Sequence, residues 1–195
     1  MNLVERARNI LFTPKTEWNV IAGESATVGS LFTSYVIPLS LIPVLATLLG
    51  ELLRSGSFIG LHFFIIRAIG TFLQSILSYV ITSWVVDLLA VNFGSEKNIN
   101  RSAQLVAYSL TGYWVASILG IIPWLGWLAI IAGASYSVFL MYLGAGPLKK
   151  TPEDQRIVYV IIAIVIMMVA MFIIEGVYNA IFFAGPVSGV FWHRG

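Results

Sequence analysis

The stretch TSWVVDLLAVNFGSEKN, from Thr82 to Asn98, places a carboxylate inside an apolar run. Apolar residues dominate from Trp84 to Val91, yet Asp87 lies among them. A charged side chain in such a run costs free energy unless a partner neutralises it. The polar residues after Val91 then end the run. The stretch therefore indicates the end of a helix that is buried or crosses a membrane, and it raises the question of what holds the Asp87 carboxylate.

The composition of the whole chain favours a membrane protein. Of its 195 residues, 58% are hydrophobic and only 10% are charged, whereas a soluble domain is about 45–50% apolar and about 25% charged. A chain of this length cannot hide so much apolar surface inside itself, so lipid must cover the remainder. The formal charge of +2 does not suggest a nucleic-acid partner, and the lack of cysteine excludes disulfides and thiolate metal sites.

Five apolar segments predict the fold, because each has the roughly 20 residues that cross about 30 Å of hydrocarbon. The segments are roughly Leu31–Leu49, Phe63–Val91, Ala103–Ile122, Leu125–Leu143 and Ile157–Phe183. We therefore expect an all-α membrane protein with a bundle of five transmembrane helices. Pro38 and Pro43 interrupt the first segment.

The stretch IIPWLGWL, from Ile121 to Leu128, is too short for a long loop between the third and fourth segments. Pro123 and Gly126 break the helix there, and Trp124 and Trp127 can anchor the turn at the membrane interface. These two segments should therefore form a tight antiparallel hairpin. After the fourth segment, we expect Thr151 to cap the fifth helix.

Residues 1–28 predict two short amphipathic helices at the cytoplasmic membrane surface. We expect Thr13 to be the N-cap and Pro14 the first residue of the second helix, with Trp18 at the headgroup level. Residues 29–185 form the predicted five-span domain, and residues 186–195 an outer tail.

The distribution of basic residues orients the bundle. With five spans, eight of the eleven basic residues lie on the side of the N-terminus and three on the other side. The first group is Arg6, Arg8, Lys15, Lys97, Arg101, Lys149, Lys150 and Arg156, and the second is Arg54, Arg67 and Arg194. The positive-inside rule then predicts a multi-pass protein of the cell membrane with a cytoplasmic N-terminus and a C-terminus outside.

Small and polar residues mark two faces within the spans. Ala129, Gly133 and Ser137 recur every four residues in the fourth segment, a spacing that lets another helix approach closely. A polar stripe follows one face of the second segment, and its members are Arg67, Thr71, Gln74, Ser78 and Thr82. Such a stripe faces protein or water rather than lipid. It is either a set of structural hydrogen-bonding groups or the lining of a conducting or substrate-binding site.

The intramembrane charges complete the candidate polar site. Asp87 is near the cytoplasmic edge, where Lys97, Arg101, Lys149 or helix N-terminal amides can hold it. Glu175 lies deeper in the fifth segment, with Asn179 one turn on, and Arg67 is the cation at comparable depth. We therefore predict an Arg67–Glu175 ion pair and expect Asp87→Asn to be tolerated better than Glu175→Gln.

Motifs for soluble-enzyme chemistry are lacking. No metal-ligand spacing surrounds the two histidines, and GAGPLKK, from Gly144 to Lys150, lacks the residue order of a phosphate-binding loop. The sequence therefore predicts neither catalysis nor a cofactor.

Several segments resemble the bacterial branch of the Yip family, the Rab/Ypt-interacting five-span membrane proteins. FTPKTEWNVIAGE (Phe12–Glu24) is similar to the family's proline–tryptophan lead-in, and FGSEKNINRSAQLVAYSLTG (Phe93–Gly112) to its second-loop segment. IIPWLGWL resembles its third turn, and YSVFLMYLG (Tyr136–Gly144) the end of its fourth span. Gly112 stands where the family pattern has a proline, so a different local bend is expected.

The resemblance implies a cytoplasmic N-terminus and an outer C-terminus, in agreement with the charges. In eukaryotic members it implies vesicle trafficking and binding of prenylated GTPases. Those members carry a long cytoplasmic N-terminal domain that this chain lacks, so GTPase binding is not expected here. We expect a non-enzymatic role in membrane organisation, through homo-oligomers or other membrane proteins. The alternative is a small transporter or channel that uses the polar stripe with Glu175 and Asp87.

Overall fold

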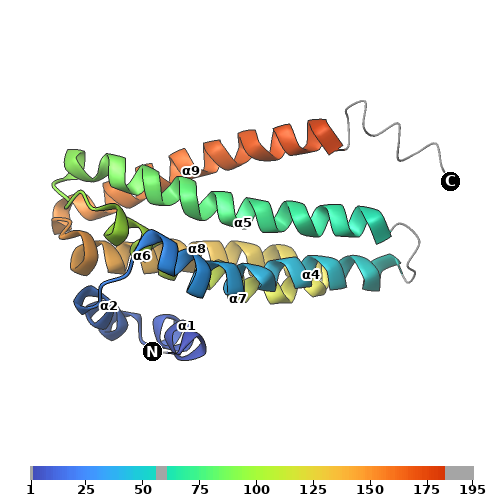
Figure 1. Cartoon of the computed structure of the whole chain (residues 1–195), viewed down its shortest axis with the longest axis horizontal. Helices are drawn as coiled ribbons and strands as arrows, with labels where there is room; N and C mark the ends of the chain where they lie inside the picture. The colour runs from blue at the N-terminus through green and yellow to red at the C-terminus, as the bar shows by residue number, and fades with distance from the viewer. Residues whose placement is uncertain (1, 56–60, 183–195) are drawn as a thin grey trace.

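The computed structural model describes residues 2–55 and 61–182, so the tail predicted for residues 186–195 lies outside the described part. Five helical segments are long and apolar enough to cross a membrane, and each runs antiparallel to the next (Figure 1). They are Val28–Ser55, Leu61–Phe93, Ile99–Ile121, Trp124–Lys149 and Glu153–Ala180. The predicted all-α, five-span fold is therefore confirmed.

The first span does not end at its two prolines. It consists of α3 (Val28–Leu31), the π-helix η1 (Phe32–Val36) and α4 (Ile37–Ser55), and both prolines lie within the continuous helix. A proline ring clashes with the carbonyl of the fourth residue before it. The wider π-turn directly before Pro38 gives that ring room, so the expected interruption becomes a local change of helix type.

The third span is irregular although its sequence predicts one continuous segment. It is divided into α6 (Ile99–Ser109), α7 (Thr111–Ala116) and the 3-10 helix η3 (Ser117–Ile121). At the break, the Tyr113 amide donates a hydrogen bond to Ser137 Oγ, 2.9 Å away, on the next span. A side chain of the fourth span thus satisfies a backbone group that a regular helix would satisfy internally.

The fourth span, α8 (Pro123–Lys149), packs its small-residue face against the third. A Cβ atom added to Gly133 would lie 2.6 Å from Ala116 Cβ and 3.0 Å from the Gly112 carbonyl oxygen. Near the turn, a Cβ atom on Gly126 would lie 3.1 Å from Gly120 Cα. These close approaches produce the tight hairpin that the sequence predicts. Trp124 and Trp127 remain exposed at the turn of this hairpin.

The second and fifth spans share a long antiparallel contact. The second is α5 (Leu61–Leu89) with the 3-10 helix η2 (Ala90–Phe93), and the fifth is α9 (Glu153–Phe182). Tyr159 donates a hydrogen bond to the Val86 carbonyl at one end, and Tyr178 donates to the Ile66 carbonyl at the other, at 2.9 Å. These two bonds set the register of the pair.

The two predicted N-terminal helices are present as α1 (Leu3–Phe12) and α2 (Pro14–Gly23), and they lie along the flank of the bundle near one end (Figure 1). The Trp18 side chain does not contact lipid headgroups, because it is fully buried against the bundle. A Cβ atom on Gly144 would lie 2.7 Å from its ring, and Tyr108 packs edge-on at 6.3 Å. Trp18 thus anchors α2 to the spans rather than to lipid.

Pro14 begins α2 as expected. Thr13 occupies the N-cap position, but its side chain does not cap the helix. The Thr13 hydroxyl makes no capping bond and donates instead to the Asn9 carbonyl at 3.1 Å. At the end of α1, the Tyr136 hydroxyl of α8 donates to the Leu11 carbonyl at 2.5 Å. Both N-terminal helices are therefore held by the bundle.

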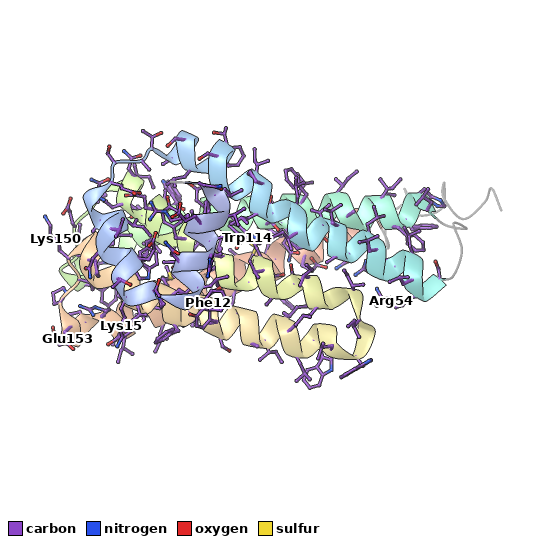
Figure 2. All side chains as sticks on the ribbon, turned by 90° about the horizontal axis from the view of Figure 1, so that it is seen from below. Phe12, Lys15, Arg54, Trp114, Lys150 and Glu153 are labelled. Carbon is purple, nitrogen blue, oxygen red and sulfur yellow. The ribbon has the colours of Figure 1, made fainter. Side chains whose placement is uncertain are left out.

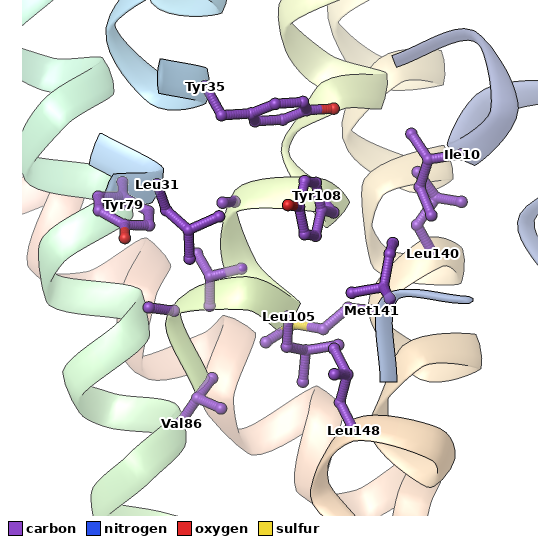
Figure 3. Packing of buried hydrophobic residues seen from close by; sticks show 14 of the residues in the cluster. Ile10, Leu31, Tyr35, Tyr79, Val86, Leu105, Tyr108, Leu140, Met141 and Leu148 are labelled. Atoms are coloured by element: carbon purple, nitrogen blue, oxygen red, sulfur yellow. The ribbon is translucent and has the colours of Figure 1, made fainter. Parts of the chain in front are cut away.

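The buried core is concentrated in the half of the bundle that carries α1 and α2. Ile10 of α1 packs beside Leu140 of α8, and Tyr108 of α6 lies at the centre of the cluster (Figure 3). Tyr35 packs edge-on against Tyr108 at 4.7 Å, and its hydroxyl is 2.8 Å from Thr111 Oγ1. The third span is the most enclosed, because the other elements pack around it.

We predict that Gly133→Ala lowers the thermal stability of the protein in detergent. The new methyl group would overlap the third span, and overpacking of this kind costs about 1–3 kcal/mol. Gly29→Ala is the matched control, because a Cβ atom there meets nothing within 4 Å. Equal melting temperatures for the two variants would contradict the close contact between α7 and α8.

Candidate functional site

Asp87 belongs to a buried polar cluster that joins three spans. Lys149 Nζ, at the end of α8, lies 3.3 Å from Asp87 Oδ1, and the lysine side chain is fully buried. Ser102 of α6 donates to the same carboxylate oxygen at 3.0 Å and accepts from Lys149 Nζ at 2.6 Å. Of the cations expected near Asp87, Lys149 is the one that pairs with it. We call Asp87, Ser102 and Lys149 the inner cluster.

The chain reversal after α8 positions the lysine. Lys150 adopts a left-handed conformation with φ 53°, which ends the helix directly after Lys149. Thr151 donates from its hydroxyl to the Ala145 carbonyl at 3.0 Å, and Ser95 donates to Thr151 at 2.9 Å. Thr151 therefore closes the C-terminus of the fourth span, whereas the sequence predicts it as the cap of the fifth. A hydroxyl two residues before a helix can serve either end, and the left-handed turn decides between them.

The inner cluster neutralises its own charges. The lysine ammonium has three protons, and its acceptors are Asp87, Ser102 and the Asn98 carbonyl, the last at 3.4 Å. Every donor direction is thereby used, so the arrangement fits a structural contact between spans.

A second buried network holds the N-terminal helices. Arg6 of α1 bonds to Glu17 of α2 and, at 2.5 Å, to Glu24, and it lies over the Tyr108 ring at 5.5 Å. Arg101 of α6 donates to the Glu24 carbonyl at 3.0 Å. We call Arg6, Glu17 and Glu24 the N-terminal latch.

Burial alone would lower the pKa of the Arg6 guanidinium, but the hydrogen bond and negative charge of Glu24 outweigh it and raise that pKa above its ordinary value. Arg6 is therefore charged at every physiological pH. From the sequence, Arg6 counts only as an orientation signal, because nothing in its local pattern distinguishes a buried arginine from an exposed one.

The polar stripe of α5 lines a cavity of about 360 Å³. Thr71, Gln74, Ser78 and Thr82 all contribute to its wall, whereas Arg67, Asp87 and Glu175 do not. Parts of α6, α7, α8 and α9 complete the lining, and Ser137 of the small-residue face is among these residues. The structure thus brings the uncharged residues of the α5 stripe together at the cavity and leaves Asn179 and the three charged residues outside it.

The predicted Arg67–Glu175 ion pair is not formed, although both residues belong to the described part. Arg67 Nε lies 3.6 Å from Glu51 Oε1 on α4, and Arg54 also pairs with Glu51 at 2.7 Å. Glu175 accepts a hydrogen bond from Asn179 at 3.1 Å on an exposed face of α9. Depth along a helix can be counted from the sequence, but the direction in which each side chain points depends on how the helices pack.

The fold and the cavity define a polytopic helical membrane protein, and the part of the chain that the structure describes holds no cluster of side chains suited to a metal ion. The Yip1 domain model matches residues 8–174, and the chain belongs to this family. Comparisons with curated proteins and with solved structures find no match.

We predict that Asp87→Asn destabilises the protein, because it leaves the buried Lys149 ammonium without a counterion. Removing one partner of a buried pair typically costs about 3–5 kcal/mol. The double variant Asp87→Asn with Lys149→Met removes both charges and should recover much of the loss in chemical or thermal denaturation.

Glu96→Gln is the matched control, because the neighbouring Glu96–Lys150 pair is largely exposed, and we expect no measurable change from it. A double variant no more stable than Asp87→Asn alone would contradict the pairing. The buried lysine also reverses the order expected from the sequence, so Asp87→Asn should now be less well tolerated than Glu175→Gln.

Proposed function

We propose that the protein is a non-enzymatic membrane protein that organises membrane components by self-association within the plane of the bilayer. Membership of the Yip1 domain family and the five-span architecture support this class of role. The observation that carries the proposal is the outer half of α9, where polar and small residues share a surface that no other described element covers.

Helix α9 is the least enclosed of the five spans, since 17% of its most apolar stretch is buried, against 56% for the third span. It lies at the edge of the bundle (Figure 1). A Cβ atom on Gly176 would meet nothing within 4 Å. Ala180 follows one turn later and is also exposed. The Gly176–Ala180 spacing allows a second helix to approach closely.

Glu175 and Asn179 make exposure of this surface to lipid unfavourable. The register of α9 on α5 puts Glu175 deeper in the bundle than Arg67, by roughly two residues or about 3 Å. A carboxylate and an amide on a lipid-exposed face are costly, and interhelical hydrogen bonds reduce that cost.

A second copy of the chain is the partner that fits this surface. The face carries an acceptor and a donor one turn apart, so two copies related by a two-fold axis can exchange hydrogen bonds between Glu175 and Asn179. The position of α9 at the bundle edge lets two α9 helices meet without displacing other spans.

A small transporter or channel is the second candidate, because the polar stripe lines a cavity. Two observations weigh against a charged substrate. The Glu175 side chain lies away from the cavity, and the Asp87 carboxylate is bound within the inner cluster.

We predict that Gly176→Leu weakens self-association about tenfold or more, which corresponds to about 1.4 kcal/mol. The leucine would hold the two α9 helices apart. The measurement is energy transfer between donor- and acceptor-labelled copies in liposomes as the protein is diluted with lipid. Val165→Leu, which adds bulk to an exposed position on the other half of α9, should leave the transfer unchanged. Equal transfer in wild type and Gly176→Leu would rule out this face.

We also propose that the N-terminus is cytoplasmic and the C-terminus outside, in the cell membrane. Lys15 and Lys150 lie toward one end of the bundle and Arg54 at the opposite end (Figure 2). Most basic residues thus gather at the end that carries α1 and α2, which supports this orientation.

Reporter fusions test the orientation. Fusions near Asn98 and Pro152 should report the cytoplasm, and fusions at residue 56 and at the C-terminus should report the outer side. A cytoplasmic C-terminal reporter would overturn the orientation.

A further inference from the structure

The cavity beside the polar stripe has the size and position of a site for a molecule that enters from the bilayer. Its volume of about 360 Å³ is within the roughly 300–1,000 Å³ range of small-molecule sites. Ala134 and Val138 of α8 and Met168 of α9 line it and are exposed. The cavity therefore opens sideways between α8 and α9, on the apolar surface of the bundle.

The deep wall of the cavity carries polar groups without partners. Thr82 Oγ1 and Ser109 Oγ line it, belong to residues that are 3% exposed, and have no hydrogen-bond partner in the described structure. Their neighbours differ, since Thr71 and Ser75 donate to the carbonyls of Arg67 and Thr71. Buried polar groups are almost always satisfied, so these two hydroxyls indicate a missing hydrogen-bonding group inside the cavity.

Gln74 adds a polar group that is partly exposed rather than buried. Its side-chain amide lines the same wall and makes no hydrogen bond to any residue that the structure describes. Along α5, Gln74 and Thr82 are eight residues apart, about 12 Å. An alkyl chain with a small head can extend over this length.

Another part of the cavity lining is apolar and adaptable. All four methionines other than Met1 line the cavity, and they are Met141, Met167, Met168 and Met171. Methionine side chains are flexible and polarizable, and they suit surfaces that accommodate alkyl groups of varied shape. Figure 3 shows Met141 among the packed core residues, close to Leu105.

No charged side chain is among the described residues that line the cavity. A charged headgroup would find no counterion there and would lose its hydration on entry. The chemistry of the walls thus selects a molecule that has an alkyl chain and an uncharged head able to donate and accept hydrogen bonds.

We propose that this cavity binds an uncharged, hydroxyl-bearing single-chain lipid of the monoacylglycerol class. The head hydrogen-bonds to Thr82 and Ser109, and the chain lies along the methionine wall, past Gln74, toward the opening between α8 and α9. This binding does not depend on self-association, because one copy of the chain forms all of the cavity walls.

The test is photo-crosslinking with a monooleoylglycerol that carries a diazirine in its chain. The full chain is embedded in nanodiscs at one copy per disc, so a failure of self-association does not affect the result. We expect saturable labelling that concentrates on peptides containing Met141, Met167 and Met171. Unlabelled monooleoylglycerol should compete at least tenfold better than oleate, whose head is charged. Labelling spread evenly over the exposed apolar residues, or equal competition by oleate, would overturn the proposal.

Matched variants distinguish lipid binding inside the cavity from general contact of lipid with the bundle surface. The double variant Thr82→Val with Ser109→Ala keeps the shape of the wall but removes both hydroxyls, and it should weaken monooleoylglycerol binding about tenfold or more. Ser83→Ala is the control, because Ser83 is equally buried but its hydroxyl bonds to the Tyr79 carbonyl outside the cavity. Ala134→Phe narrows the opening and should reduce labelling while leaving the hydroxyl wall intact. Undiminished labelling in both the double variant and Ala134→Phe would show that the lipid does not enter this cavity.

Discussion

The contact between Asp87 and Lys149 ties the second and fourth spans together, and Ser102 brings the third span into the same contact. In a bundle surrounded by lipid, the hydrophobic effect does not distinguish helix–helix contact from helix–lipid contact, so polar bonds and close packing set the arrangement. A fully buried ammonium has few positions in which it is satisfied. The inner cluster therefore restricts how α5, α6 and α8 meet, and the turn from Lys149 to Glu153 then places α9 against α5.

The remaining bundle is built around an irregular third span. Its break after Ser109 is compatible with a lipid environment because Ser137 accepts the Tyr113 amide and the fourth span encloses the altered backbone. The approach at Gly133 that makes this possible needs a residue without a side chain. The N-terminal helices pack on both of these spans, with Trp18 against Gly144 of the fourth and Arg6 over Tyr108 of the third. Irregular backbone, small residues and the latch are thus parts of one packing arrangement.

Polar groups outside these contacts fall into two sets with different surroundings. Thr82, Ser109 and Gln74 face a cavity that opens toward lipid, and Glu175 and Asn179 face outward on α9. Satisfied polar groups rigidify a membrane bundle, whereas unsatisfied ones are costly and mark surfaces that bind something else. The first set borders the packed core, since Val106 and Met141 belong to both the core and the cavity lining, and the second lies on the exposed face of α9.

The sequence by itself determined the membrane environment, the five spans, the two N-terminal helices and the tight third turn, because length, hydropathy and turn residues act locally along the chain. It also limited the candidate partners of Asp87 to a few cations near one end. The tertiary structure decided which cation is used, that Glu51 rather than Glu175 pairs with Arg67, and that Trp18 packs against the bundle instead of the headgroups. It also decided that the stripe faces a cavity. These outcomes depend on which helices are neighbours, and helical periodicity shows which residues share a face but not which helix that face meets.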